Sequence, residues 1–252
     1  MINIILIFVL TLALSCEGKI TDRGTLSKTV YNYKQEKKFN VPVMYINDSN
    51  FTELKNPYFH HSVGGKPIEE ETFVAIKYDD NHLFIDFECR DNPRIDQNFY
   101  TEDNSQMFKQ EVFEIFISPG EAASENYWEI QLNPNNALFL GKVNNRYKND
   151  HTFDIELISN DVAKIEHSVK KDHKNNIWKG RLKIPLTLIQ DPDHKNNKVF
   201  RMNLFRIISN QDQTDPNWKN NAKNATFACW SSTMTKKPNF HVPDYFGFLY
   251  LK

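Results

Sequence analysis

Short runs of alternating apolar and polar residues fill the chain after about residue 40, and clusters of Asn, Asp, Gly and Pro separate them. Residues 72–78 and 83–89 are two such runs, and the polar residues 79–82 between them fit a tight turn, so this stretch predicts a β-hairpin. Further strands are predicted over 111–118, 127–133, 154–159, 163–169, 178–184, 200–207 and 245–251, and a single helical turn over 185–189. Evenly spaced strands without long helices between them predict an all-β protein, an antiparallel β-sandwich.

Alternation assigns polar side chains to one face of two neighbouring strands. In the predicted strand 127–133, the polar face is a row of hydrogen-bonding groups: Tyr127, Glu129, Gln131 and Asn133. In the strand before it, Glu114 lies between two apolar neighbours on one face, where a carboxylate needs a partner. Two interpretations stay open: an ion pair with an arginine such as Arg206 across the sheet, or contact with a bound ligand.

Residues 1–16 have the character of an export signal. Residues 2–14 are almost wholly apolar, a length typical of a signal-peptide core and short for a membrane span. Ser15 and Cys16 resemble a bacterial lipobox, whose cysteine becomes the lipidated N-terminus. We therefore predict an exported lipoprotein of the cell envelope, on the outer membrane, attached to the membrane through a lipid on Cys16. A plain cleaved signal or a retained anchor is the alternative. Residues 17–40 would form a tether and residues 41–252 the β-sandwich domain.

The nearly balanced charge narrows the classes of partner and activity. The chain has 31 Lys and Arg against 32 Asp and Glu, which argues against a nucleic-acid partner held by phosphate neutralisation. Hydrolase motifs such as G-x-S-x-G and H-E-x-x-H are missing from the sequence, so no enzyme is predicted. Glu111 and Glu114 point to opposite faces of one strand, whereas Glu114 and Glu129 on neighbouring strands leave a glycoside hydrolase open as an alternative.

Cys89 and Cys229 either pair in an oxidising compartment or stay as free thiols.

Four motifs together resemble the carbohydrate-binding module family 9-like proteins. They are EVFEIFISP at 111–119, YWEIQLNP at 127–134, RMNLFRI at 201–207 and FHVPDYFG at 240–247. Their order and spacing match that family across most of the chain after the signal. The resemblance implies a β-sandwich with calcium sites that binds an oligo- or polysaccharide, such as a xylan or glucan, without catalysis, and holds a terminal sugar between two aromatic rings.

The resemblance also implies which rings would form that clamp. Phe108 stands shortly before the first motif, where one clamp aromatic is expected, and Trp230 stands near the C-terminus, where the other is expected. The family has Trp where this chain has Phe108, and a phenyl ring offers less stacking area and no N–H donor. Trp218, in a polar Asn-rich loop, is a rival stacking platform.

Polar contacts to the sugar complete the expected site, and among these residues the resemblance bears on Glu114 while strand alternation supplies the others. The resemblance places Glu114 where the family has a sugar-contacting glutamate. Gln131 and Asn133 would bond sugar hydroxyls from the neighbouring strand, and Arg206 would orient the carboxylate of Glu114.

Calcium is implied by the resemblance and has candidate ligands near predicted turns. Asp79, Asp80 and Asp91, together with Glu88, lie at strand ends, where loop oxygens suit this ion. Each of them could equally be a turn or surface residue. The alternative function is an envelope scaffold for protein partners that has kept the fold and lost sugar binding; buried rather than exposed clamp rings would favour it.

Overall fold

The computed structural model of this 252-residue chain describes residues 40–48, 50–146, 152–194, 197–214 and 223–252. The predicted signal, Cys16, nearly all of the predicted tether and Trp218 lie outside these residues. No helix among the described residues has the length and apolar character that crossing a membrane requires.

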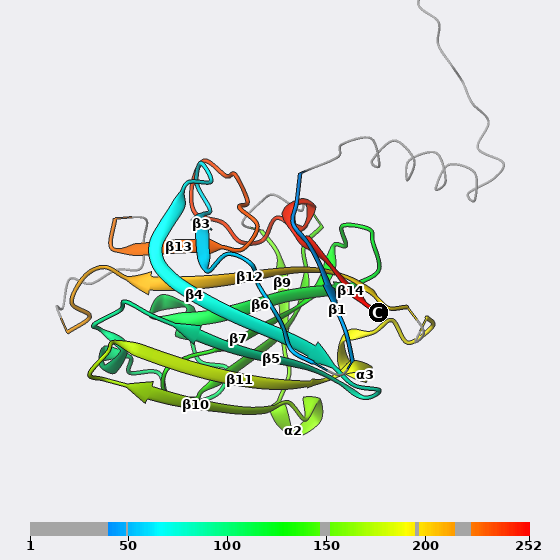
Figure 1. Cartoon of the computed structure of the whole chain (residues 1–252), viewed down its shortest axis with the longest axis horizontal. Helices are drawn as coiled ribbons and strands as arrows, with labels where there is room; N and C mark the ends of the chain where they lie inside the picture. The colour runs from blue at the N-terminus through cyan, green and yellow to red at the C-terminus, as the bar shows by residue number, and fades with distance from the viewer. Residues whose placement is uncertain (1–39, 49, 147–151, 195–196, 215–222) are drawn as a thin grey trace, which may run out of the picture. The chain divides into compact units, whose positions relative to one another are not determined.

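Strands dominate the described part of the chain (Figure 1). They are β1 (Val43–Ile46), β2 (Thr52–Glu53), β3 (Tyr58–His61), β4 (Pro67–Tyr78), β5 (His82–Cys89), β6 (Val112–Pro119), β7 (Asn126–Leu132), β8 (Leu138–Asn144), β9 (Asp154–Leu157), β10 (Glu166–Asp172), β11 (Ile177–Pro185), β12 (Val199–Ser209), β13 (Ala225–Cys229) and β14 (Gly247–Leu251). The helices are short: α2 (Asn160–Ala163), α3 (Leu186–Ile189), η1 (Ile95–Gln97), η2 (Met107–Lys109) and η3 (Pro243–Tyr245).

The strands form two layers that share one long strand. Sheet I contains β10, β11, β5 and β4 in that order, with β2 beside β4; sheet II contains β3, β13, β12, β6, β7, β8 and β9, with β14 beside β12 and β1 beside β14. Strand β4 pairs with β3 at its start and with β5 further on, and it curves from one layer into the other (Figure 1). Among the described strands, only β1 and β14 pair in parallel, so the architecture is the predicted antiparallel β-sandwich.

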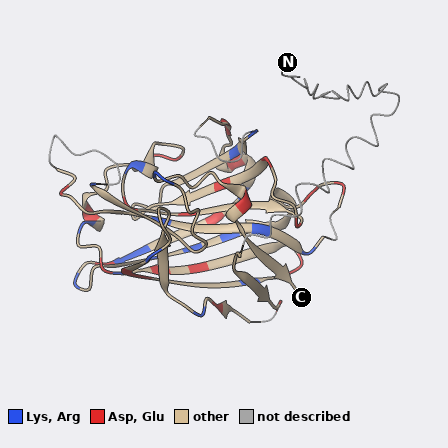
Figure 2. Ribbon diagram, turned by 90° about the horizontal axis from the view of Figure 1, so that it is seen from above, with Lys and Arg blue, Asp and Glu red and all other residues tan. Residues whose placement is uncertain are grey.

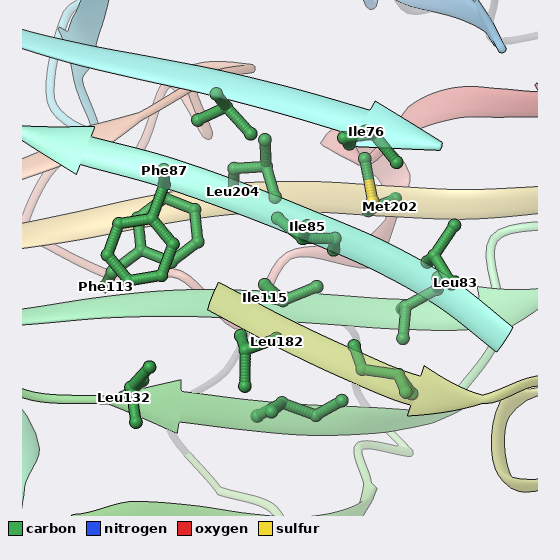
Figure 3. Packing of buried hydrophobic residues seen from close by; sticks show 14 of the residues in the cluster. Ile76, Leu83, Ile85, Phe87, Phe113, Ile115, Leu132, Leu182, Met202 and Leu204 are labelled. Atoms are coloured by element: carbon green, nitrogen blue, oxygen red, sulfur yellow. The ribbon is translucent and has the colours of Figure 1, made fainter. Parts of the chain in front are cut away.

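Apolar side chains fill the space between the sheets. Phe87 and Ile85 of β5 face Phe113 and Ile115 of β6 (Figure 3), and the rings of Phe87 and Phe113 stack with centroids 3.9 Å apart. Gly180 of β11 lies against the Phe87 ring, where a Cβ atom would collide with it. The main core therefore comes from the inward positions of alternating strands.

A second apolar cluster covers the outer face of sheet II. Phe116 and Phe205 project outward from β6 and β12 and pack against Phe240 and Phe246 of the C-terminal segment. Strand β6 therefore has both faces buried, since Phe113, Ile115 and Ile117 fill the inter-sheet core while Val112 and Phe116 belong to the second cluster. This outer cluster supports the region where the candidate site lies.

The outer face of sheet I is charged. Asp86 of β5 pairs with Arg181 of β11 at 2.6 Å, and Glu88 of β5 forms an ion pair with Lys179 of β11. Positively and negatively charged residues are interspersed along the strands (Figure 2). The alternation predicted for 178–184 is confirmed, because β11 buries Trp178 and exposes Lys179 and Arg181.

Most of the predicted strands and the helical turn at 185–189 are confirmed, with ends shifted by a few residues. The prediction over 163–169 began too early, because Ser159 caps the short helix α2 and β10 starts at Glu166. Strands β1, β2, β3, β8 and β13 were not predicted, since they are short or lack a clear alternation. Cys89 and Cys229 are both free and buried, and they belong to different apolar clusters, so a disulfide between them is wrong.

Candidate functional site

A cavity of about 740 Å³ opens on the outer face of sheet II. Its floor consists of Glu114 from β6 and Glu129 and Gln131 from β7. Aromatic side chains supply most of its walls: Phe108, Phe139, Phe153, Phe227, Phe240 and His241. Lys109 and Asn239 also line it. A concave, mostly apolar site with a few convergent polar groups is typical of a small-molecule binding site.

Strand alternation and register bring the floor residues together. Glu114 faces outward because its neighbours Phe113 and Ile115 fill the inter-sheet core. In the antiparallel pair of β6 and β7, Glu114 is opposite Gln131, and Glu129 is two residues further along β7 on the same face. The two carboxyl groups are therefore diagonal neighbours, within reach of one ligand.

The floor residues are buried and carry acceptor atoms without partners. Exposed fractions are 2% for Glu114, 5% for Glu129 and 0% for Gln131. The side-chain nitrogen of Gln131 donates to Oε1 of Glu129. Within the described residues, Oε1 of Glu114, Oε2 of Glu129 and Oε1 of Gln131 have no hydrogen-bond partner. Buried polar atoms are nearly always paired, so three open acceptors in one cavity indicate the place of a ligand or of water.

Burial sets the protonation of the two carboxyls. It raises the pKa of Glu129 to about 7, although the hydrogen bond from Gln131 opposes this rise. Burial also raises the pKa of Glu114 well above its ordinary value, and the nearby charge of Glu129 adds to the effect. A carboxyl pair on one floor therefore resists carrying two negative charges until a ligand provides donors.

His241 lies beside the floor and joins it to the wall. Its Nδ1 atom is 2.7 Å from the hydroxyl of Tyr127, and its Nε2 atom is 4.0 Å from Oε2 of Glu129. Its ring stacks on Phe153 with centroids 3.8 Å apart. These contacts fix the imidazole within the C-terminal motif, and the ring also lines the cavity.

The two aromatic residues of the predicted clamp lie in different places. Phe108, on η2, lines the cavity, is 37% exposed and meets Phe139 edge-on at 6.4 Å. Trp230 is not among the lining residues; it is half-buried, packs against the inter-sheet core and covers Gly247, where a Cβ atom would lie 2.6 Å from the indole. The structure thus brings Phe108 to Glu114 but leaves Trp230 outside this cavity.

Asn133 continues the polar row of β7 but serves the turn after it. Its amide nitrogen donates to the carbonyl of Tyr100 at 2.8 Å, and its Oδ1 accepts from the backbone N–H groups of Asn135 and Ala137. Gln131 lines the cavity, so the row predicted along β7 divides between cavity-lining and structural positions.

Arg206 lies on the other face of sheet II. It is fully buried and donates from Nε to Oε1 of Glu111 at 2.8 Å, and Trp178 donates to the same oxygen at 2.9 Å. The proposed ion pair with Glu114 is therefore wrong, because Arg206 is opposite Phe113 and shares its inward direction. Arg206 does not line the cavity or reach a ligand in it.

The three aspartates considered for calcium do not form one site. Asp79 and Asp80 precede β5 and Asp91 follows it, so the eight-residue strand holds them roughly 25 Å apart. Asp79 accepts from the backbone N–H groups of Asn81 and His82, as a turn residue does, and Asp91 accepts from that of Glu71. The described residues contain no group of three His, Cys, Asp or Glu placed to hold a metal ion. These aspartates therefore do not fit a shared calcium ion.

Sequence reasoning missed several wall residues. Phe139 comes from the unpredicted strand β8, Phe153 precedes β9, and Phe227 comes from the unpredicted strand β13. Glu129 was placed in the polar row and paired with Glu114 only for the hydrolase alternative. The alternation of Glu129 with Gln131 was the signal that could have placed it in the site.

Comparison with known proteins gives a family match. Residues 67–251 match the model of a family described as carbohydrate-binding family 9. A protein of Arthroderma benhamiae described as an extracellular protein is 29% identical over 189 residues, which cover 72% of this chain and 78% of that protein.

Solved structures share the fold. A protein of Bacteroides uniformis presumed to bind carbohydrate aligns with a TM-score of 0.59 at 13% identity, over 83% of this chain and 97% of that one. A family 9 carbohydrate-binding module of Caldicellulosiruptor kristjanssonii in complex with cellotriose aligns with a TM-score of 0.47 at 11% identity, over 84% of this chain and 94% of the module. The first likeness shows a common fold.

Proposed function

Since this chain belongs to carbohydrate-binding family 9, we propose that the cavity on sheet II binds a carbohydrate without breaking it. The observation that carries the proposal is the set of open acceptors on Glu114, Glu129 and Gln131 beneath aromatic walls. Sugar hydroxyls donate hydrogen bonds to such acceptors, and the apolar face of a pyranose packs on aromatic rings.

Phe108 is the wall ring best placed for stacking in this proposal. It is part of η2, next to Lys109, and it keeps more than a third of its surface exposed while lining the cavity. Trp230 no longer takes part, because its indole covers Gly247. The sugar would therefore lie against one side of the cavity and hydrogen-bond to the floor.

The family match favours binding over hydrolysis. A glycosidase needs two carboxyls that flank the scissile bond. Glu114 and Glu129 are neighbouring carboxyls on one face of adjacent strands, but the family to which the chain belongs is described as carbohydrate-binding. We therefore propose a non-catalytic role in the use of a polysaccharide such as xylan or glucan.

The proposed location is outside the cytoplasm. The apolar residues 2–14 followed by Cys16 support export and attachment to the outer membrane of the cell envelope through a lipid. The relative described as an extracellular protein also supports export. Growth with labelled palmitate tests the anchor, because a Cys16→Ser variant should lose the label.

Calorimetric titration of the full chain with xylo- and cello-oligosaccharides tests the binding. We expect saturable binding that weakens about tenfold or more in Glu114→Gln, because an amide NH2 group replaces one of the carboxyl oxygens that can accept a hydrogen bond from a sugar hydroxyl. Glu156→Gln, at an exposed position of β9, is the matched control and should bind as the wild type does.

Two results would count against this function. Absence of binding to a broad panel of sugars, by a protein whose thermal unfolding is cooperative, would favour the scaffold alternative. Release of shortened products over a long incubation, lost in Glu114→Gln, would contradict the non-catalytic role.

A further inference from the structure

The floor of the cavity requires a ligand that brings hydrogen-bond donors. Its three open atoms are acceptors, on residues that are all at least nine-tenths buried: Glu114, Glu129 and Gln131. The one nitrogen of the floor, that of Gln131, already donates to Glu129. Each of these acceptors therefore gains a hydrogen bond from a ligand that carries a donor of its own.

The floor also has two carboxyl groups, which can carry two negative charges when both are ionised. Within the described residues, neither Glu114 nor Glu129 has a Lys or Arg nitrogen within ion-pair distance, and the nearest basic atom is Nε2 of His241 at 4.0 Å. Lys109 lines the wall but makes no ion pair with either carboxyl. Buried carboxylates are otherwise paired, as Glu111 is with Arg206 in the same protein.

The walls favour a positive charge as well. The face of an aromatic ring carries negative potential and attracts a cation held over it. Phe108, Phe153 and Phe227 bring three phenyl rings to the cavity that the two carboxyls line. Acidic floor and aromatic walls together form a site for a cationic group.

We propose that the cavity prefers a sugar unit that carries a protonated primary amine, such as a glucosamine unit, over the same sugar with a hydroxyl in that place. This inference rests on the proposed function, because it assigns a ligand to the same cavity. The ammonium donates to Glu114 and Glu129, a hydroxyl donates to Gln131, and the pyranose ring packs on the phenyl wall. Acetylation of the amine removes its charge and adds bulk, so it removes the preference.

Proton release gives a second, independent signature. Burial raises the pKa of Glu129 to about 7 and that of Glu114 well above its ordinary value, so the empty floor retains protons near neutral pH. An ammonium group at the floor stabilises the ionised carboxyls and expels those protons. The other titratable groups that line the cavity are Lys109 and His241. A neutral sugar does not provide this driving force.

The test titrates the full chain with three matched trisaccharides: the β-1,4-linked trimers of glucosamine, glucose and N-acetylglucosamine. We expect the glucosamine trimer to bind about tenfold or more tightly than the glucose trimer near neutral pH. Titration in two buffers of different ionisation enthalpy should show protons released with the glucosamine trimer and few with the glucose trimer. Glu129→Gln should reduce both the preference and the proton release, and Glu156→Gln should change neither. Cooperative thermal unfolding of each variant excludes loss of the fold as the cause.

Each of the other outcomes contradicts the amine preference, the proposed function or both. Equal or tighter binding of the glucose trimer overturns the amine preference and leaves carbohydrate binding intact. Binding of ethylammonium as tightly as of the glucosamine trimer overturns the sugar part of both proposals. Failure of all three trimers to bind, while xylo-oligosaccharides bind, overturns the amine preference alone. Failure of the trimers and of the broad sugar panel overturns the proposed function as well.

Discussion

The outer faces of both sheets carry carboxylates, but the surroundings of these carboxylates differ between the two sheets. On sheet I, Asp86 meets Arg181 and Glu88 meets Lys179 in contact with solvent. On sheet II, Glu114 and Glu129 are buried among aromatic rings without a Lys or Arg partner in the described residues. A paired, hydrated carboxylate contributes to solubility and costs little, whereas a buried, unpaired one is expensive. The difference identifies the outer face of sheet II as the candidate binding face.

Glu111 makes the contrast sharper because it lies only three residues from Glu114. It is equally buried, yet it accepts hydrogen bonds from Arg206, Trp178 and Asn92. One residue satisfies a structural network between the sheets, and the other keeps an open acceptor toward a cavity. Partners, rather than burial, separate the structural carboxylate from the one available to a ligand.

Removal of the partner from the structural carboxylate should have the largest effect. Arg206→Met leaves Glu111 buried with only its neutral donors, so we expect a loss of about 3–5 kcal/mol in the free energy of unfolding. Urea denaturation followed by tryptophan fluorescence measures it. The double variant Glu111→Leu with Arg206→Met should recover part of the loss. A loss below about 1 kcal/mol would show that the ion pair does not hold the sheets together.

The unpaired carboxylates should make stability depend on pH. The pKa of Glu129 is about 7 in the folded protein and 4.5 ordinarily, so between these values the folded state keeps a proton that the unfolded state has lost. Stability from this group is therefore greatest below pH 4.5 and falls by about 3 kcal/mol as the pH rises through 7. Denaturation at several pH values should show a smaller fall in Glu129→Gln. Identical profiles in the two proteins would disprove the role of Glu129.

The two predicted clamp aromatics should separate into a binding residue and a packing residue. Phe108→Ala should weaken sugar binding about tenfold, because it removes the exposed stacking ring. Trp230→Ala should leave affinity within about twofold and cost about 2–3 kcal/mol in stability, because its indole packs on the core and Gly247. Calorimetry and thermal unfolding measure the two effects. Loss of affinity in Trp230→Ala at unchanged stability would return this residue to the site.

A substitution on the charged outer face of sheet I should have the smallest effect on stability. Arg181→Ala breaks a surface ion pair with Asp86, in which the arginine side chain is 63% exposed, so we expect a loss below about 1 kcal/mol. Salt screens exposed charges, so the difference from the wild type should shrink in 1 M NaCl. Thermal unfolding at low and high salt checks this. A large loss of stability that persists at high salt would contradict the contrast between the surface ion pairs of sheet I and the buried pair of Glu111 and Arg206.

Local patterns predicted much of the fold because the order of apolar and polar residues along a strand reflects which of its faces is buried. Lys179, Arg181 and Lys183 alternate with buried residues in β11, and the turn at Asp79 fits its hydrogen bonds to Asn81 and His82. The signal failed in β8, where consecutive residues are buried on both faces and no alternation exists. Strand β6 is also buried on both faces, and its sequence predicted the strand but not that Val112 and Phe116 belong to a second apolar cluster.

The site divides in a similar way. Alternation along β6 and β7 placed Glu114 and Gln131 on one face from the sequence, because a strand turns successive side chains to opposite sides. Phe153, Phe227 and His241 were not predicted, because they come from segments far from β6 and β7 in the sequence and line the same cavity only in the folded chain. Trp230 was assigned by its position near the end of the chain, and position did not reveal which face its indole covers.

By itself, the sequence determined the sandwich, the family and the outward direction of Glu114, since these follow from local alternation and from motifs within single strands. The tertiary structure decided which carboxylate obtained a partner. Arg206 is opposite Phe113 in the register of β12 and β6, so its guanidinium enters the space between the sheets and reaches Glu111 instead of Glu114. A register shift of one residue would have reversed that choice, because neighbouring positions on a strand face opposite sides of the sheet.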